Sequence, residues 1–326
     1  GVHYVKGSAT ANTIDMGVAA NVTAADYIDA GAGADVVKVT ADANGTGAVF
    51  DDLVGVETIS VTANGANDAK ITLTYTAANT DAMTITAAAL TNASAAFTFL
   101  ASDAQVDGAL TITGGAGADT ITGGDGADII TGGTGGDALN GDVGGDTFII
   151  NAGDAAVTLA NTAGTGRSTY TGEDSITGFA LAGTDKLDFA VDAVIAAATA
   201  GTDGTDSTGV LTSGAPGTDV IASHAISATG IVTFDDAGTF ATAVTLGDAG
   251  DVAAAIDYLQ NNDIGDAGAT VVFAGTGNGG AGYTVYQQTA TTAGGVGGYD
   301  VVELLGVTAT GGLMLDATTA STILIA

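Results

Sequence analysis

Hydrophobic and polar residues alternate along much of the first third of the chain. Between Val39 and Thr113, short runs place Ile, Leu, Val or Phe at every second position with threonine between them, as in 56–63 (VETISVTA), 69–77 (AKITLTYTA) and 108–115 (GALTITGG). A two-residue period is typical of strands that bury one face. Turn-forming Asn, Asp and Gly separate the runs. The pattern predicts a series of short strands, which either stack continuously onto the segment that follows or form a separate sandwich.

A nine-residue period replaces the two-residue one between Gly114 and Ile149. Four units follow one another without interruption: GGAGADTIT, GGDGADIIT, GGTGGDALN and GDVGGDTFI. Each has glycines at fixed places, an aspartate at position six and a large apolar residue at position eight. With 52 glycines in the chain, one GGxG would mean little, but four copies in phase are not a chance pattern. An array of this kind indicates a parallel β-roll that binds calcium.

The chemistry of the nonad explains its residues. Glycines at positions one, two and four allow tight turns that bring carbonyl oxygens close to an ion. The position-six carboxylates add the hard oxygens that calcium prefers. Two nonads close one turn, so residues eighteen apart stack, and strands ~4.8 Å apart place their charges side by side. We therefore expect calcium to be part of the fold, held between the stacked pairs Asp119 and Asp137, and Asp128 and Asp146.

The N-terminal stretch contains the same nine-residue unit in a degenerate form, here called the worn nonads. In 7–15 (GSATANTID) Asn12 stands at the aspartate position, and 21–29 and 30–38 place Asp26 and Asp35 there. Two interpretations remain open for this stretch. One is a second calcium site near Asp26 and Asp35. The other is a plain β-turn, in which Gly31 and Gly33 serve only backbone geometry.

The last third of the chain has a different pattern. We expect helices at 193–200 and 251–261, the second starting behind Asp248 and Asp251, and loops at 161–172 and 201–219. The runs TVVFAG and GYTVYQQ predict a hairpin, and YDVVELLGV predicts a further strand.

The predicted fold is all-β: a calcium-binding parallel β-roll or β-helix solenoid, with a β-rich C-terminal domain that carries one or two short helices. The expected domains are a degenerate roll or solenoid (1–113), the calcium roll with a capping strand (114–190), and a C-terminal assembly or secretion domain (191–326).

Composition excludes several classes of function. The formal net charge is −32 with only five Lys and Arg residues. This excludes a nucleic-acid-binding surface, because phosphate binding needs clustered cations. Cysteine is absent, so disulfides and thiolate chemistry are absent too. No apolar run approaches eighteen residues, so we expect no membrane span. Outside the nonads, the many aspartates either bind ions or serve solubility alone.

Motifs for catalysis are missing. His3 and His224 are the only histidines, so a zinc site of the HExxH kind cannot form, and we expect His224 to be a surface or turn residue. No GxSxG elbow occurs, and GAGADV lacks the third glycine of a dinucleotide fingerprint. The many carboxylates could include the two catalytic acids of a glycoside hydrolase, but most aspartates stand in turn-forming loops. We therefore expect no enzyme.

Two resemblances follow from these residues. The nonads resemble those of RTX proteins, which bacteria export by type I secretion. The segments 174–179 (DSITGF) and 183–189 (GTDKLDF) are similar to the stretch that caps the open end of the roll in serralysin-type RTX domains. The runs AIDYLQNN, ATVVFAG, GYTVYQQ and YDVVELLGV resemble the end of RTX-type bacterial surface-layer proteins. Those proteins keep an uncleaved C-terminal secretion signal, with which the apolar ending STILIA is compatible, and form a calcium-dependent lattice.

The RTX resemblance implies a set of calcium ligands. The carboxylates would come from Asp119, Asp128, Asp137 and Asp146. The carbonyls would come from three loops: Gly114, Gly115, Ala116 and Gly117; Gly123, Gly124, Asp125 and Gly126; and Gly132, Gly133, Thr134 and Gly135. The side chain of Asp125 either adds a ligand or faces solvent. Asp142 and Val143 depart from the pattern in the fourth nonad and put its last carbonyl ligands in doubt.

The resemblances imply a structural role. We expect an S-layer subunit that the type I secretion machinery exports and that self-assembles, with calcium, into a homo-oligomeric lattice or filament on the extracellular cell surface. The alternative is the C-terminal secretion and folding module of a larger RTX adhesin or exoenzyme. The chain begins with Gly1 and no leader, which suggests a processed product or a C-terminal portion. Family members attach to lipopolysaccharide through an N-terminal region, and nothing in this chain identifies one.

Overall fold

The structure is a computed structural model. It describes residues 2–43, 45–51, 53–75, 80–101, 106–162, 166–179, 185–191, 194–195, 200–201, 209–210, 220–221, 223–227, 230–235, 244–261, 264, 267–277, 281–289, 298–307, 313–315 and 322–325. The chain forms two compact units, Gly1–Ile149 and Ile150–Ala326, and each is described by itself. The described residues form an all-β fold of mostly parallel strands in the first unit, with a single α-helix in the second. The division at 113 and 190 expected from the sequence stays a prediction.

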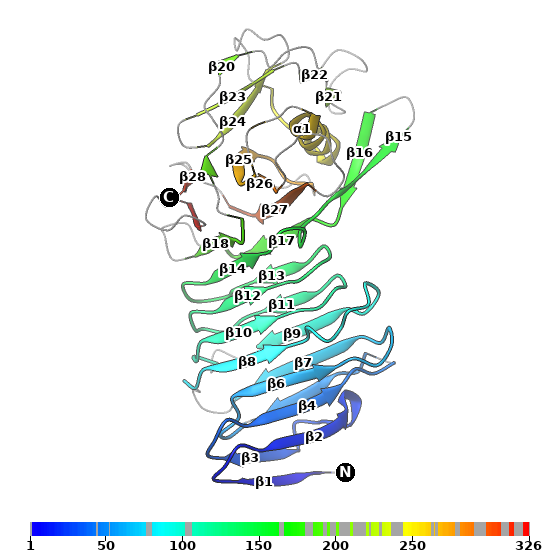
Figure 1. The fold of residues 1–326 in the computed structure, drawn as a ribbon, viewed down its shortest axis with the longest axis vertical. Helices are drawn as coiled ribbons and strands as arrows, with labels where there is room; N and C mark the ends of the chain where they lie inside the picture. The colour runs from blue at the N-terminus through cyan, green and yellow to red at the C-terminus, as the bar shows by residue number, and fades with distance from the viewer. Residues whose placement is uncertain are drawn as a thin grey trace. The chain divides into compact units, whose positions relative to one another are not determined.

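The N-terminal unit is a stack of parallel turns, drawn from blue to green in Figure 1. One sheet has the order β2-β4-β6-β8-β10-β12-β14, a second has the order β5-β7-β9-β11-β13, and β1 pairs with β3. A 3-10 turn, η1 (Ala19–Asn21), follows β2. The strands are β1 (Tyr4–Ser8), β2 (Thr13–Val18), β3 (Tyr27–Gly31), β4 (Val36–Thr40), β5 (Ala48–Asp51), β6 (Thr58–Thr62), β7 (Ala69–Thr74), β8 (Met83–Thr86), β9 (Phe97–Ala101), β10 (Leu110–Thr113), β11 (Thr120–Thr122), β12 (Ile129–Thr131), β13 (Ala138–Asn140) and β14 (Thr147–Ile150).

Strand register shows how the nonads wind. Ile112 pairs with Ile130 and Ile130 with Phe148, while Ile121 pairs with Leu139 in the other sheet. Each step is eighteen residues, so two nonads close one turn as the sequence predicts. Parallel pairing continues without a break from β6 through β8 and β10 to β12. The strands between Val39 and Thr113 therefore stack continuously onto the nonads and do not form a separate sandwich.

Inward apolar side chains fill the interior of the stack. The position-eight residues Ile121, Ile130, Leu139 and Phe148 are all buried, and the alternating strands of the earlier turns bury their Ile, Leu, Val and Phe residues in the same way. The rings of Phe97 and Phe99 stack with centroids 6.4 Å apart. Burying apolar surface contributes roughly 25 cal/mol per Å², so this column of side chains is the main source of stability that does not depend on an ion.

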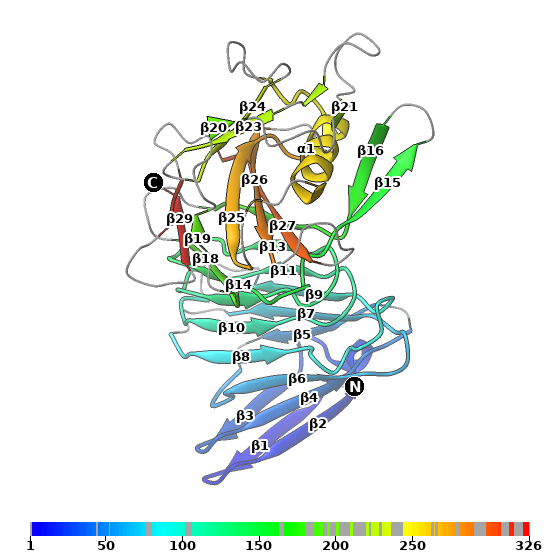
Figure 2. The same ribbon diagram turned by 45° about the horizontal axis from the view of Figure 1, so that its top comes forward.

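The C-terminal unit combines a mixed sheet with α1 (Ala249–Asn261), which lies beside β25, β26 and β27 (Figure 2). That sheet has the order β19-β25-β26-β27-β17, and a second sheet has the order β18-β29-β28. Smaller sheets are formed by β15 with β16, by β20-β23-β24 and by β21 with β22. The strands are β15 (Thr158–Thr162), β16 (Gly166–Thr171), β17 (Asp174–Thr177), β18 (Lys186–Phe189), β19 (Val194–Ile195), β20 (Ala200–Gly201), β21 (Gly209–Val210), β22 (Val220–Ile221), β23 (Ser223–Ile226), β24 (Val232–Asp235), β25 (Ala269–Ala274), β26 (Gly282–Gln288), β27 (Tyr299–Leu305), β28 (Leu313–Leu315) and β29 (Thr322–Ile325).

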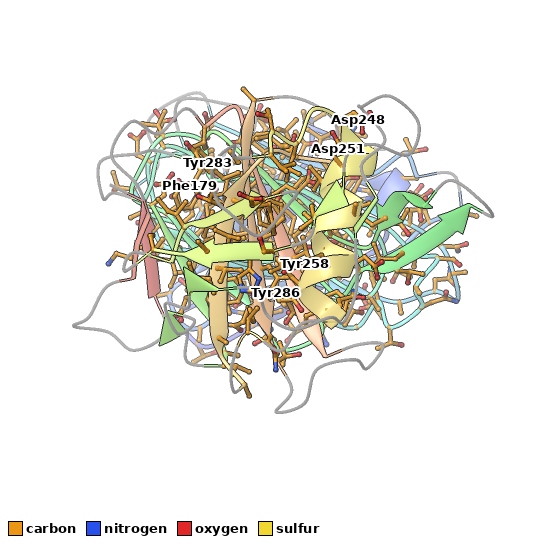
Figure 3. The ribbon with its side chains drawn as sticks, turned by 90° about the horizontal axis from the view of Figure 1, so that it is seen from above. Phe179, Asp248, Asp251, Tyr258, Tyr283 and Tyr286 are labelled. Carbon is orange, nitrogen blue, oxygen red and sulfur yellow. The ribbon has the colours of Figure 1, made fainter. Side chains whose placement is uncertain are left out.

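Some predictions for this unit are confirmed. β25 and β26 form the expected antiparallel hairpin, and β27 adds the further strand. The helix begins behind Asp248, whose carboxylate accepts the Asp251 N–H at 3.0 Å, while Asp251 accepts the Gly247 N–H at 2.7 Å. Figure 3 shows both aspartates at the start of α1 and Tyr258 further along it. These bonds satisfy N–H groups that a helix start leaves open.

Other predictions are wrong. Where the sequence predicts a helix at 193–200, Val194 and Ile195 form β19, paired with β25, and Ala200 begins β20, while 193 and 196–199 lie outside the described residues. The loop expected at 161–172 is largely an antiparallel hairpin of β15 and β16. Local composition misled in both cases, because pairing with a partner strand overrides weak helix or loop propensity. Of the loop expected at 201–219, Gly201 ends β20 and Gly209 and Val210 form β21, while 202–208 and 211–219 lie outside the described residues.

His224 also differs from the prediction, since it is 2% exposed and not a surface residue. Its Nδ1 lies 3.0 Å from the Tyr258 hydroxyl oxygen, and the two rings meet edge to face. Tyr258 comes from α1, so the helix contacts β23 through this pair. A buried polar ring is tolerated when it has such a partner. Within the described residues, no helix has both the length and the apolar character needed to cross a membrane.

Asp300 makes the C-terminal unit sensitive to pH. Burial raises the pKa of this carboxyl to about 6, against the lowering effect of the Gly153 N–H, and the charge of Asp154 raises it further. Because the folded state then holds its proton more tightly than the unfolded chain, the stabilising contribution of this group is fully present below pH ~4 and is lost as the pH rises through the folded pKa. The loss from this group is about 2–3 kcal/mol.

We expect Asp300→Asn to remove that part of the pH dependence, because the amide oxygen can still accept the Gly153 N–H without carrying charge. Urea unfolding of the whole chain in saturating calcium, between pH ~4 and ~7, measures it. A variant whose stability falls with pH as steeply as the parent chain would show that Asp300 is not the group responsible.

Calcium sites in the nonapeptide loops

The four position-six aspartates join successive turns of the roll. Each is at most 2% exposed. In each, Oδ1 accepts a backbone N–H from the preceding turn: Phe97 donates to Asp119 (2.7 Å), Leu110 to Asp128 (2.8 Å), Asp119 to Asp137 (2.8 Å) and Asp128 to Asp146 (2.9 Å). The predicted stacking of Asp119 with Asp137, and of Asp128 with Asp146, is therefore observed. One carboxylate oxygen of each residue holds the turns in register.

The second carboxylate oxygen faces the nonad's own loop. Oδ2 of Asp119 accepts the Gly115 N–H at 2.6 Å, and Oδ2 of Asp128 accepts the Gly124 N–H at 2.9 Å. In both cases the donor is the glycine at position two. The loop is thereby folded over the carboxylate, which fixes the direction in which this oxygen points.

Two oxygens from successive turns lie close to the first glycine of the nonads. A Cβ atom built on Gly114 would lie 2.3 Å from Asp119 Oδ2 and 2.1 Å from the carbonyl oxygen of Gly132, in the next turn. At Gly123 the corresponding distances are 2.2 Å to Asp128 Oδ2 and 2.6 Å to the Gly141 carbonyl oxygen. A carboxylate and a carbonyl from successive turns thus converge where a side chain would otherwise stand. Hard carboxylate and carbonyl oxygens are the ligands that calcium takes, so the chemistry of the residues present fits the ion.

The other loop glycines are required by close backbone contacts. A Cβ on Gly133 would lie 2.0 Å from the Gly115 carbonyl oxygen, and one on Gly135 would lie 2.5 Å from that of Gly117. Thr134 donates its N–H to the Gly115 carbonyl at 3.2 Å, and Ala116 donates to the Leu90 carbonyl at 2.8 Å. The loops therefore stack backbone against backbone, which brings their carbonyl groups to the turns above and below.

Two loop aspartates that the sequence analysis singled out have different outcomes. Asp142, in place of the second glycine of the fourth nonad, has φ 71°. It is the only non-glycine residue with positive φ among the described residues, and aspartate tolerates this conformation better than most side chains. Asp125 is half-buried, and its N–H donates to the Val106 carbonyl at 2.9 Å. Whether its carboxylate is a ligand stays a prediction.

The buried carboxylates are costly to ionise without a cation. Burial raises the pKa of Asp119 to about 6 and that of Asp128 to about 7, although backbone N–H donors to both act in the opposite direction. For Asp128, the negative charges of Asp146 and Asp142 raise the pKa further. Calcium binds the ionised form, so it replaces protons at these groups.

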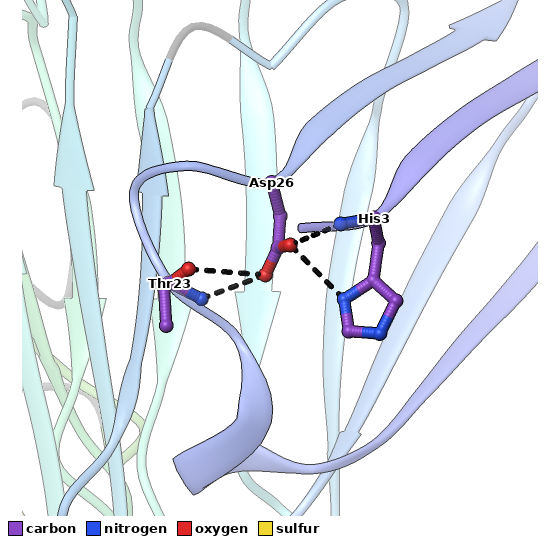
Figure 4. A network of polar contacts seen from close by, with 3 residues as sticks. All are labelled: His3, Thr23 and Asp26. Carbon is purple, nitrogen blue, oxygen red and sulfur yellow. Dashed lines mark hydrogen bonds and ion pairs between the residues drawn. The ribbon is translucent and has the colours of Figure 1, made fainter. Parts of the chain in front are cut away.

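The aspartates of the worn nonads make the same inter-turn bonds. In Figure 4, Asp26 Oδ1 accepts the His3 N–H at 2.6 Å and lies 3.0 Å from His3 Nδ1, while Oδ2 accepts the Thr23 N–H at 2.8 Å. Burial acts to raise the pKa of Asp26, but the backbone donors and His3 together lower it. Asp35 Oδ1 accepts the backbone N–H of Asn12 at 2.6 Å. Both carboxylates therefore position the backbone.

Gly31 and Gly33 are explained by backbone geometry. Gly31 has φ 95° and would place a Cβ 2.1 Å from the Ser8 carbonyl oxygen, and Gly33 has φ 141° and would place one 2.7 Å from the Ala11 nitrogen. Asp35 Oδ2 is buried and receives no hydrogen bond from the described residues. The second calcium site near Asp26 and Asp35 stays a prediction.

Glu57 has a role that the sequence interpretation missed. Its Oε2 accepts the Asp35 N–H at 2.7 Å. Each nonad aspartate accepts a backbone N–H from the preceding turn in the same way. A signal was present: Asn12, Asp35 and Glu57 each stand two residues before an apolar residue, and those residues, Ile14, Val37 and Ile59, are register partners. The turn lengths there are 22 and 23 residues instead of eighteen, which hid the repeat.

The roll sites are not built from side chains alone. Among the residues that the structure describes, no three His, Asp or Glu side chains come together in a way that could hold a metal ion. The oxygens that converge at Gly114, and those at Gly123, are a carboxylate from one turn and a carbonyl from another. Backbone oxygens must therefore supply much of a calcium coordination shell.

Comparison with known proteins agrees with this geometry. The family model of the RTX calcium-binding nonapeptide repeat, which comprises four copies of the repeat, matches residues 23–43 and 111–148. The second segment contains the four nonad aspartates, and the first contains Asp26 and Asp35. A search of curated proteins found no match to the chain. The matched segments and the converging oxygens of the loops lead to one conclusion: this chain carries RTX calcium-binding nonapeptide repeats and binds calcium through them.

Proposed function

We propose that this protein is a secreted structural subunit of a bacterial surface layer, without enzymatic activity, and that it folds and self-assembles when calcium is present. The observation that carries the proposal is the coupling of the fold to the ion. Carboxylate and carbonyl oxygens converge from successive turns, at Gly114 and Gly123. Calcium bound there joins the turns, so binding and folding are one event.

This coupling suits export by a type I secretion machinery. Where calcium is scarce, the buried aspartates disfavour the stacked turns and the chain stays unfolded for transport. Outside, millimolar calcium meets sites of an extracellular kind, whose dissociation constants are about 10⁻⁴–10⁻³ M. A tenfold excess of calcium over Kd contributes about 1.4 kcal/mol per site. Several sites together then decide whether the roll is folded.

Assembly into a lattice or filament is the part of the proposal that most needs a test. Electron microscopy and light scattering should compare the purified chain in calcium, in magnesium and in chelator. We expect sheets or filaments in calcium only. The matched control is the Asp128→Asn, Asp146→Asn variant, which should need more calcium to assemble. A monodisperse monomer under every condition, with the roll folded by circular dichroism, would overturn the surface-layer role and favour a secretion and folding module of a larger protein.

A further inference from the structure

Two of the three glutamates in the chain come together in the C-terminal unit. Glu303 lies on β27, and Glu173 immediately precedes β17, which pairs in parallel with β27. Ser175 is the register partner of Glu303, so Glu173, two positions before Ser175, lies next to Glu303 on the same face. The chain has 37 acidic residues of which only three are glutamates, which makes this pairing notable in a protein that otherwise uses aspartate.

One oxygen of Glu303 is held in place. Glu303 is fully buried at 0% exposure, and its Oε1 accepts hydrogen bonds from the Tyr170 hydroxyl and from the Gly277 N–H. A Cβ on Gly277 would lie 2.6 Å from the Tyr170 hydroxyl oxygen and 2.9 Å from Glu303 Oε1. Only glycine leaves room for this arrangement. The carboxylate is thus fixed by segments from β16 and from the turn after β25.

The other oxygens of the pair have no donor. Oε2 of Glu303 and Oε2 of Glu173 are both buried, and neither receives a hydrogen bond from the described residues. The ion pairs formed by described basic side chains involve His3 and Lys6, both in the N-terminal unit. Burying a carboxylate oxygen without a partner is expensive. Two such oxygens on neighbouring groups indicate that something other than a described side chain neutralises them.

The electrostatics of the cluster agree with this geometry. Burial raises the pKa of Glu173 to about 7, and the charge of Glu303 raises it further. Burial, with the same two carboxylates, also raises the pKa of the Tyr170 hydroxyl. Tyr170 therefore stays protonated and donates to Glu303, which leaves the open oxygens to accept a positive charge.

We propose that Glu173 and Glu303 form a divalent-cation site in the C-terminal unit, separate from the nonapeptide loops and suited to calcium. Its two hard carboxylate oxygens are the ligands that calcium prefers, with carbonyls or water completing the shell. One divalent ion neutralises both charges. Because the site joins β16, β17, β27 and the turn after β25, binding would fasten the β15–β16 hairpin to the main sheet.

The test counts bound ions in the full chain. Equilibrium dialysis with calcium should show that Glu173→Gln with Glu303→Gln binds one ion fewer per chain, while the calcium midpoint of roll folding, followed by far-UV circular dichroism, is unchanged. The Asp128→Asn, Asp146→Asn variant should show the opposite: a shifted roll midpoint and an intact C-terminal site. Asp257→Asn, a half-buried change on α1, serves as the control that alters neither.

Two further variants keep the proposal testable if the double variant folds poorly. Glu173→Gln alone, and Tyr170→Phe, should weaken calcium binding at this site several-fold and reduce the rise in melting temperature that calcium produces. If the number of bound ions and their affinity match the parent chain in all these variants, the site does not exist. If Glu173→Gln raises the melting temperature equally with and without calcium, the pair shares a proton and the proposal is overturned. Neither result depends on lattice assembly.

Discussion

Replacing Asp128 and Asp146 together by alanine should raise the calcium concentration at which the roll folds by about tenfold or more. Asp146 Oδ1 accepts the Asp128 N–H, and Asp128 Oδ1 accepts the Leu110 N–H. Asp128 Oδ2 also converges with the Gly141 carbonyl oxygen at Gly123. Alanine removes both the carboxylate ligands and these inter-turn bonds. Calcium titration followed by far-UV circular dichroism measures the shift of the midpoint.

Asparagine at the same two positions separates the role of the side chain as a calcium ligand from its role as an acceptor of the inter-turn N–H. The asparagine oxygen can still accept the inter-turn N–H, but at position 128 the amide nitrogen cannot accept the Gly124 N–H, and the side chain carries no charge. Without calcium, the asparagine variant should lose less stability than the alanine variant, because it keeps the inter-turn bonds and two buried like charges are gone. With calcium, it should resemble the alanine variant. An unchanged calcium midpoint in both variants would remove Asp128 and Asp146 from the ligand set.

Gly133→Ala is expected to be among the most damaging single changes in the roll. Gly133 has φ 104°, and a Cβ there would lie 2.0 Å from the Gly115 carbonyl oxygen of the neighbouring turn. The substitution must push two backbones apart in addition to straining its own conformation, at a cost of roughly 3–5 kcal/mol. The shifted loop would also move the carbonyls that serve the ion.

Gly65→Ala is the matched control for this prediction. Gly65 also has positive φ, at 68°, but a Cβ there meets nothing within 4 Å. It should cost about 1–2 kcal/mol, the price of the left-handed conformation alone. Urea unfolding in saturating calcium gives both values. Equal losses in the two variants would contradict the close stacking of the loops.

The roll could be predicted from the sequence because its rules are local. Ile121, Ile130, Leu139 and Phe148 recur at a fixed spacing, and each depends only on residues one turn away. The worn turns were harder, because Val37 pairs with Ile59 at a distance of 22 residues and Ile59 with Ile85 at 26. A changing period conceals a repeat even where the same acid-to-backbone bond is kept, as at Glu57.

The C-terminal unit shows what the sequence leaves open. The hairpin of β25 and β26 joins neighbouring strands, and its alternating pattern predicted it. The β15–β16 hairpin, the burial of His224 and the pairing of Glu173 with Glu303 did not follow from any local pattern. Tyr170 and Glu303 are 133 residues apart in the chain and share a hydrogen bond. Nothing in the neighbourhood of either residue encodes that contact.

The sequence by itself determined the nonapeptide repeats, their eighteen-residue turn and the ion they bind, since a helical stack repeats one short-range contact in every turn. Only the tertiary structure decided which oxygen of each aspartate holds the backbone and which faces the loop. It alone brought two glutamates, a tyrosine and a glycine from three separate segments into one buried cluster. The spacing of residues determines the contacts between neighbouring turns, whereas contacts between distant segments depend on the packing of the whole unit.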